Sequence, residues 1–162
     1  MHVERVVAML RHWTVALRLP AEEARRWLRA GWLHDALRDA PEAEMRRWAP
    51  GIAGPVELRH GPAAAARAEL EGESDADVLS AVRWHSVGWD GWGRTGRALY
   101  CADFLEPGRP FAREERAALA IAYPDDPDGV LRAVVTRRLN HAIAQGWTLP
   151  PESVAFRTAM CA

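Results

Sequence analysis

An adjacent histidine and aspartate, His34 and Asp35, interrupt an otherwise apolar stretch of the sequence. We expect a helix over about residues 21–38, and at about 100° per residue Asp35 shares a stripe with Leu28 and Gly31, with His34 at its flank. Such a stripe faces the core, where an isolated carboxylate costs on the order of several kcal/mol or becomes protonated. A divalent metal ion would supply the missing counter-charge and would also bind the neighbouring imidazole.

Six side chains of these two chemical kinds stand out along the chain, each in or beside an apolar helical segment or at a Gly-Pro break. They are His2, His34, Asp35, His60, His85 and Asp103. Imidazole and carboxylate without thiolate suit an ion such as iron, manganese or cobalt. Six protein ligands exceed the needs of one catalytic ion that keeps positions open for water and substrate. We therefore predict two divalent ions, which Asp35 could bridge through its two oxygens.

The composition limits the partners that these residues can serve. The formal net charge is −1 at pH 7, so we expect no general attraction to nucleic acid. All 21 basic residues are arginines, which leaves arginine, backbone N–H groups or metal ions to bind phosphate. No apolar run approaches the ~20 residues that span a bilayer, and we expect no leader segment. The two cysteines, Cys101 and Cys161, predict no disulfide framework, which fits a cytoplasmic protein.

The elements that must position these side chains are all predicted to be helical, because the sequence lacks period-two alternation and hairpin signals. The expected helices cover about residues 2–17, 21–38, 41–48, 62–70, 76–85, 98–105, 113–122, 127–146 and 151–157. The Pro/Gly-rich segment Ala49–Pro55 is expected to be a loop, and Ser74 or Asp75 should cap the helix that carries His85. No repeat or linker divides the chain, so we predict a single domain over residues 1–162.

Several longer stretches surround the six side chains and carry a resemblance to a known family. They are His2–Val7, Leu33–Asp35, His60–Pro62, Arg83–Gly88, Tyr100–Arg109 and Pro151–Arg157. The sequence resembles the HD-domain metal-dependent phosphohydrolases, and within them the YqeK-type symmetrical bis(5′-nucleosyl)-tetraphosphatases. A bare His-Asp pair is weak evidence, whereas His-Gly-Pro together with Ala-Asp-Phe-Leu-Glu-Pro-Gly-Arg at this spacing is specific. The resemblance implies an all-α fold, the HD-domain helical bundle.

The same resemblance implies two metal ions, often iron, bound by the six side chains. By this resemblance His2, His34, Asp35 and Asp103 hold one ion, and Asp35, His60 and His85 hold the other. A water bridging the ions would lose a proton near neutral pH and attack phosphorus as hydroxide, with Asp35 and His60 as the catalytic residues. The implied reaction converts diadenosine tetraphosphate and water into two ADP molecules. Because His2 begins its helix, we expect fraying to weaken its hold on the metal.

Other residues are candidates for binding the substrate. They are Arg5, Arg38, Arg109 and Arg157 as phosphate clamps, with the Gly61 N–H and the Ser86 hydroxyl as further donors. A guanidinium group can bind phosphate oxygens through two parallel hydrogen bonds, and a helix start offers N–H donors. Trp84, Trp89 and Trp92 could stack on adenine, although packing is the favoured interpretation for Trp84.

The identity of the substrate stays open at this point. Arg38 stands where the family usually has lysine, and Phe156-Arg157-Thr158 stands where it has Ala-Arg-Asn. An alarmone or a deoxynucleotide is therefore an alternative substrate, and a nucleotide-binding domain without catalysis is a third interpretation. Retention of all six ligand types argues against the third. The expected partners are two divalent ions and a small-molecule nucleotide, without nucleic acid or membrane, and a homodimer is compatible with the sequence.

Overall fold

The computed structural model of the protein describes residues 1–52 and 55–161. Within them all regular structure is helical, as the sequence predicts. The α-helices are α1 (His2–Ala16), α2 (Ala21–Leu33), α3 (Glu42–Trp48), α4 (His60–Leu70), α5 (Ala76–Trp84), α6 (Arg94–Leu105), α7 (Arg113–Ala122), α8 (Pro127–Ala144) and α9 (Pro151–Cys161). A short 3-10 helix, η1 (Val56–Leu58), precedes α4. Of the expected loop Ala49–Pro55, residues 53 and 54 lie outside the described residues.

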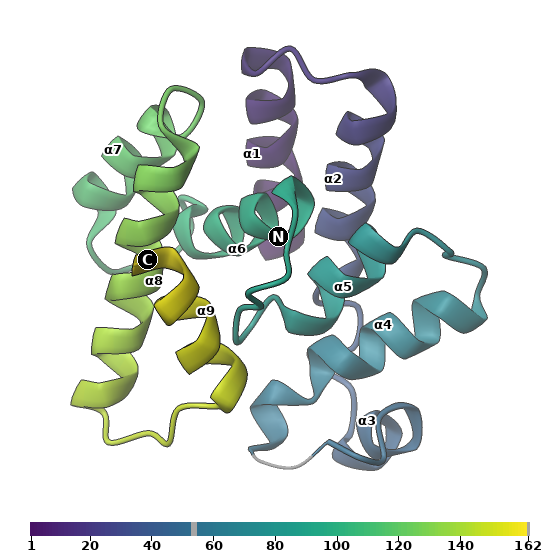
Figure 1. Cartoon of the computed structure of the whole chain (residues 1–162). Coiled ribbons are helices and arrows are strands. Elements are labelled where there is room, and N and C mark those ends of the chain that lie inside the picture. The colour runs from purple at the N-terminus through teal and green to yellow at the C-terminus, as the bar shows by residue number, and fades with distance from the viewer. Residues whose placement is uncertain (53–54, 162) are drawn as a thin grey trace.

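Helix α6 lies at the centre of the described fold (Figure 1). Helices α1, α2, α5, α7 and α8 all pack against it, while α4 packs on α5 and α9 packs on α8. The α6 residues Ala98, Leu99, Cys101 and Ala102 are fully buried. Mostly small side chains let neighbouring helices approach α6 from several sides. Asp103 lies on this buried part of α6, so its carboxylate is carried into the interior.

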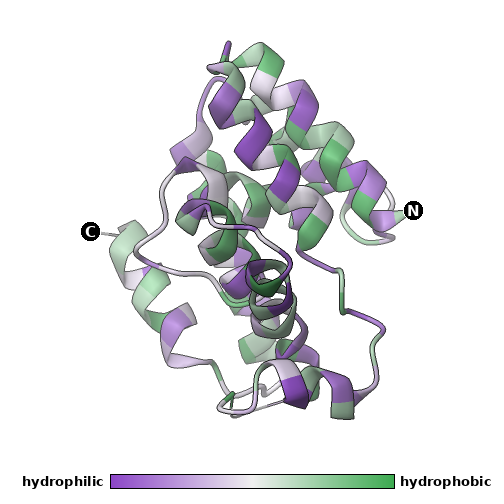
Figure 2. Ribbon diagram, turned by 90° about the vertical axis from the view of Figure 1, so that its right-hand side faces the viewer, coloured by the Kyte–Doolittle hydropathy of each residue, from purple (hydrophilic) through white to green (hydrophobic). Residues whose placement is uncertain are grey.

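The helices around α6 are amphipathic. Figure 2 shows hydrophobic and hydrophilic residues alternating along the upper helices, where α1 and α2 lie. Helix α1 buries Val6, Val7, Leu10 and Trp13, the spacing of a helix with one apolar face. Within the part of the chain that the structure describes, no helix combines the length and the apolar character needed to cross a membrane.

The predicted end of the second helix is wrong. Helix α2 stops at Leu33, and residues 34–39 form turns in which Arg38 N–H donates to the Asp35 carbonyl at 3.0 Å. The Nδ1 of His34 lies 2.7 Å from the Gly31 carbonyl, the acceptor that a continuing helix would have given to the N–H of Asp35. The buried face also differs from the prediction, because His34 is fully buried while Leu28 is only partly covered.

Two predicted helix ends are confirmed. The carboxylate of Asp75 caps α5 by accepting from the N–H groups of Asp77 at 3.0 Å and Val78 at 3.3 Å. Gly146, just beyond α8, has a φ of +69°, the left-handed conformation that often follows a helix and favours glycine. Such local signals predict helix ends because they involve only neighbouring residues.

Candidate metal centre

Four histidines from four different helix ends meet in the structure. His2 begins α1, His34 follows α2, His60 begins α4 and His85 follows α5. His34, His60 and His85 have exposed fractions of 0%, 2% and 1%, so water has almost no access to them. The side chain of His2 is 26% exposed and forms the more open edge of the cluster. Residues spread over more than half of the chain therefore share one location.

The three buried histidines are oriented in the same way. In each, Nδ1 donates to the backbone carbonyl three residues earlier: His34 to Gly31 at 2.7 Å, His60 to Glu57 at 2.6 Å and His85 to Val82 at 2.8 Å. A histidine that is neutral and protonated on Nδ1 carries a lone pair on Nε2, the arrangement typical of a metal ligand. The Nε2 atoms of His60 and His85 face each other at 3.0 Å, and two facing lone pairs favour a cation between them.

The carboxylate of Asp35 lies between the histidines. Its Oδ1 is 3.1 Å from Nε2 of His60 and 3.4 Å from Nε2 of His85. Its Oδ2 is 3.7 Å from Nε2 of both His2 and His34. Oδ1 is buried and has no hydrogen-bond partner among the described residues, which follows if the facing Nε2 atoms carry lone pairs. A buried anionic oxygen without a donor is a site that a cation would satisfy.

The electrostatics of the centre agree with this arrangement. Burial lowers the pKa of His34 to about 4, which keeps its imidazole neutral at pH 7. Burial alone would raise the pKa of Asp35, but the surrounding imidazole groups outweigh it and hold that pKa well below its usual value. A neutral imidazole and an ionised carboxylate are the forms that bind metal ions.

The side chains form two overlapping groups that fit the predicted pair of ions. In the first group, the potential ligand atoms of His2, His34 and Asp35 all lie within 4.8 Å of one another. In the second group, those of Asp35, His60 and His85 do the same. Asp35 is common to both groups, so it can bridge two ions by offering one oxygen to each. Oxygen and nitrogen donors without thiolate suit a divalent ion of the iron, manganese or cobalt type.

Asp103 adjoins the first group through His2 rather than lying within it. Its Oδ1 is 3.1 Å from Nε2 of His2. The same oxygen accepts from Nη2 of Arg109 at 2.6 Å, and Oδ2 accepts from Nη1 of Arg138 at 3.3 Å. Burial opposes ionisation, but the hydrogen bond to His2 and these guanidinium groups hold the pKa of Asp103 well below its usual range. As a metal ligand, Asp103 would share its oxygens with two arginines.

Two charged residues near the centre were not assigned a role from the sequence. Glu106, 1% exposed, accepts from His2 Nδ1 at 3.1 Å and from Arg5 Nε at 2.5 Å. Arg138 donates to Asp103 and, at 3.0 Å, to the Ser86 carbonyl. Arg138 could have been found from the sequence, because it follows Val134 and Val135 by one turn on the apolar stripe of its helix.

The predicted phosphate clamps lie in different surroundings. Arg109 is bound to Asp103, and Arg5 is bound to Glu106. Arg38 is 52% exposed, with Nη1 at 3.7 Å from Oδ1 of Asp35. Arg157 is exposed on α9, and no contact within the described residues joins it to the centre. Three of the four predicted clamps therefore adjoin the centre.

The remaining predicted donors lie beside the second group of ligands. The Ser86 hydroxyl is 3.3 Å from Nε2 of His60 and 3.2 Å from Nε2 of His85. Gly61 is buried, and a Cβ atom there would lie 2.8 Å from the Arg83 carbonyl and 3.2 Å from Nδ1 of His85. Glycine at this position therefore lets α4 approach α5 closely enough for His60 and His85 to meet.

The tryptophans singled out from the sequence pack within the fold. Trp84 and Trp89 stack on each other with ring centres 5.1 Å apart. Trp92 is 5% exposed and packs against Tyr100 and Phe156. This arrangement agrees with the packing interpretation of Trp84 and extends it to Trp92.

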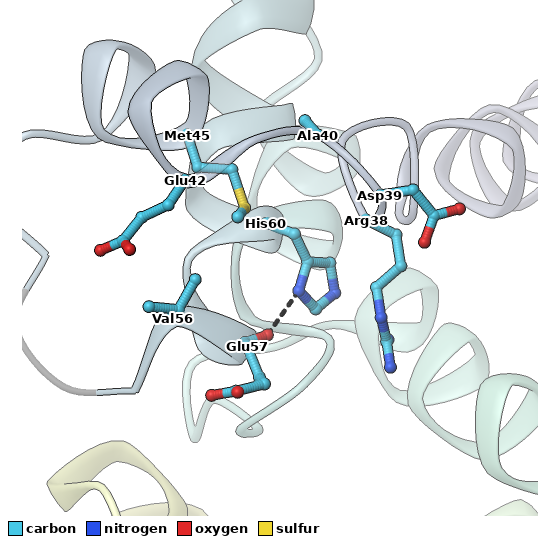
Figure 3. A pocket seen from close by; sticks show the side chains of 8 residues that line it. All are labelled: Arg38, Asp39, Ala40, Glu42, Met45, Val56, Glu57 and His60. Atoms are coloured by element: carbon cyan, nitrogen blue, oxygen red, sulfur yellow. Dashed lines mark hydrogen bonds between the residues drawn. The ribbon is translucent and has the colours of Figure 1, made fainter.

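A cavity of about 340 Å³ opens beside His60. It is lined by Arg38, Asp39, Ala40, Glu42, Met45, Val56, Glu57 and His60. Figure 3 shows the His60 ring between Met45 and Arg38, with Nδ1 directed to the Glu57 carbonyl. His60 is thus both a wall of the cavity and a potential metal ligand, so the cavity lies next to the centre.

Comparison with known proteins agrees with this geometry. A model of the HD domain family matches residues 1–121, so the chain belongs to the HD domain family. Among curated proteins, a symmetrical bis(5′-nucleosyl)-tetraphosphatase of Bacillus subtilis is 32% identical to this chain over 90 residues, which are 51% of this chain and 48% of that protein. One of Staphylococcus aureus is 41% identical over 54 residues, 33% of this chain and 28% of that protein. The chain thus matches less than half of the length of each of these relatives.

A solved structure extends the likeness in fold. The crystal structure of a predicted HD superfamily hydrolase involved in NAD metabolism, from Clostridium acetobutylicum, superposes with a TM-score of 0.84 at 23% identity. The superposition covers 99% of this chain and 87% of that chain. The shared architecture therefore includes α8 and α9, which lie beyond the residues matched by the family model.

Proposed function

We propose that the protein is a metal-dependent phosphohydrolase that cleaves dinucleoside polyphosphates symmetrically, converting diadenosine tetraphosphate and water into two ADP molecules. The observation that carries the proposal is the Asp35 carboxylate, whose two oxygens each face a different pair of histidines. The names of the two curated relatives support the choice of substrate and the position of cleavage.

The first group, His2, His34 and Asp35, and the second group, Asp35, His60 and His85, would each hold one divalent ion. When bound, the two ions would supply a water acidified enough to attack phosphorus and positive charge to offset that of the phosphates. The bond that breaks is the central P–O bond of the tetraphosphate, and the proton of the water ends on the products. Iron is our proposal for the ions, with manganese and cobalt as alternatives of similar ligand preference.

The chain's own groups would orient the substrate on this pair. Arg38, exposed at the rim beside Asp35, would bind a phosphate next to the centre. The cavity beside His60 would take one nucleoside, because Met45 and Val56 offer apolar surface and the carboxylates of Glu42 and Glu57 can accept hydrogen bonds from ribose hydroxyls. Three acidic side chains in this lining make it unsuited to the phosphate chain itself.

The test combines metal analysis with product analysis. Purified protein is expected to contain two divalent ions per chain by elemental analysis and to convert diadenosine tetraphosphate into ADP alone, resolved by anion-exchange chromatography. AMP together with ATP would overturn symmetrical cleavage. Two bound ions with no turnover of diadenosine tetraphosphate, but turnover of an alarmone or a deoxynucleotide in a substrate panel, would overturn the proposed substrate.

A further inference from the structure

Glu106 follows α6 directly, and its two carboxylate oxygens have different partners. Oε1 accepts from Nδ1 of His2 at 3.1 Å. Oε2 accepts from Nε of Arg5 at 2.5 Å and from the N–H of Gly108 at 2.7 Å. The carboxylate side chain is 2% exposed, so water does not compete for either oxygen. The group is therefore fixed from one side by Arg5 and Gly108 and presents its other oxygen to His2.

His2 differs from the other three histidines in the partner of its Nδ1. His34, His60 and His85 each use a backbone carbonyl within their own turn of chain, so their orientation follows from the backbone. His2 uses a side chain that is 104 residues away in the sequence. Its ring orientation consequently depends on a long-range contact between α1 and the end of α6.

We propose that Glu106 is a positioning residue, which holds His2 with Nδ1 protonated and Nε2 directed at the metal centre. The inference rests on the proposed function in that His2 is taken as a metal ligand. A carboxylate that accepts from a ligand histidine fixes the tautomer of the ring and strengthens Nε2 as a donor to the metal. Arg5, predicted from the sequence as a phosphate clamp, then acts through Glu106 by holding its carboxylate in place.

A purely structural role for the Glu106 carboxylate does not fit the surroundings. The backbone of this segment is already held by the buried Arg116, which donates to the carbonyls of Phe104 at 2.9 Å and Phe111 at 3.1 Å and also to the carbonyl of Glu106. These bonds are independent of the Glu106 side chain. The turn after α6 should thus persist when that side chain changes.

The experiment compares Glu106→Gln and Glu106→Leu with the wild type and with Glu115→Gln. Glu115 is a matched control, because it also pairs with an arginine, Arg137 at 3.1 Å, but is 64% exposed and remote from the centre. Zinc is used as a diamagnetic ion, and its affinity and stoichiometry are measured by competition with a chelator. Unfolding of the metal-free variants by denaturant reports whether the fold is retained, and nitrogen-15 NMR reports the tautomer of His2.

We expect Glu106→Leu to weaken one of the two zinc sites by roughly 10- to 100-fold and to leave the other within about twofold. Glu106→Gln keeps a neutral acceptor, so its loss should be smaller, and it serves as the folded variant if the leucine variant is unstable. The NMR spectrum of the loaded wild type should show His2 protonated on Nδ1, with a tautomer mixture in Glu106→Leu. Equal weakening of both sites, or no weakening in either Glu106 variant, would overturn the inference.

These outcomes separate the inference from the proposed function. If the selective loss of one zinc site is found but diadenosine tetraphosphate is not cleaved, the role of Glu106 is supported and the proposed substrate fails. If the wild type binds a single zinc ion without involving His2, the role of Glu106 fails whatever the enzyme hydrolyses.

Discussion

The two sides of the metal centre differ in how their charged side chains are held. On the inner side, formed by α6 and α8, Asp103 and Arg138 have side chains that are 9% and 21% exposed and bind each other. On the outer side, around the cavity beside His60, Arg38 and Glu42 are 52% and 42% exposed. The inner side is a buried network in which each charge fixes another, whereas the charged side chains of the outer side are exposed enough to reach a ligand. Substitutions on the inner side should therefore change stability and metal binding, and those on the outer side should change substrate affinity.

Asp35 connects the two sides, and its substitution should have the largest effect. Asp35→Asn keeps the shape of the side chain but removes the charge that offsets two cations. We expect both ions to be lost on desalting and hydrolysis to fall by several orders of magnitude, because both ligand groups share this carboxylate. Elemental analysis and a turnover assay provide the measurement, with the exposed Asp128→Asn as control. Retention of two ions by Asp35→Asn would contradict its bridging role.

The inner side is tested next by Arg138→Met, which leaves the buried Asp103 without one of its charged partners. We expect the metal-free protein to lose about 2–3 kcal/mol of unfolding free energy, because the buried Asp103 carboxylate then keeps only Arg109 as a guanidinium partner. Its neighbour on α8 is a control, since Arg137 is 40% exposed and pairs with the exposed Glu115. Arg137→Met should cost less than about 1 kcal/mol. If urea unfolding showed equal losses of unfolding free energy for Arg138→Met and Arg137→Met, the proposed difference between the two sides would be wrong.

The outer side is tested by Glu57→Gln, which should weaken the binding of one ligand without weakening that of another. If the carboxylate accepts a hydrogen bond from a ribose hydroxyl, ADP should bind a few-fold more weakly to the metal-loaded variant. Pyrophosphate, which has no ribose, should bind equally well or better, because a negative charge beside the centre is gone. Glu44→Gln, exposed on α3 and outside the cavity lining, is the control. Tighter binding of both ligands in calorimetry would show that Glu57 acts only as a repelling charge.

The difference between local and long-range contacts also explains which site residues the sequence could predict. His34, Asp35 and His85 were found because ionisable side chains inside apolar segments are unusual in a sequence. The end of α2 was predicted wrongly, because hydrophobic periodicity does not show that the His34 ring donates to the Gly31 carbonyl in place of the next helical N–H. Glu106 lies in a quoted motif without an assigned role, because its partners Arg5 and His2 are more than 100 residues away. The sequence therefore predicts residues that stand out among their neighbours in the chain, but not the contacts between distant residues that form the inner side.

Ser86 belongs to both sides, and its substitution should have the smallest effect. Its carbonyl accepts from Arg138 on the inner side, while its hydroxyl lies within 3.3 Å of His60 on the outer side. Ser86→Ala removes only the hydroxyl, so we expect both ions to remain and the unfolding free energy to change by less than about 1 kcal/mol. The hydroxyl is a candidate phosphate donor, so kcat/KM should fall by roughly tenfold or less, which is at most about 1.4 kcal/mol. A loss of unfolding free energy as large as that of Arg138→Met would contradict this expectation. It would show that the hydroxyl stabilises the inner network, so that Ser86 belongs to the inner side alone.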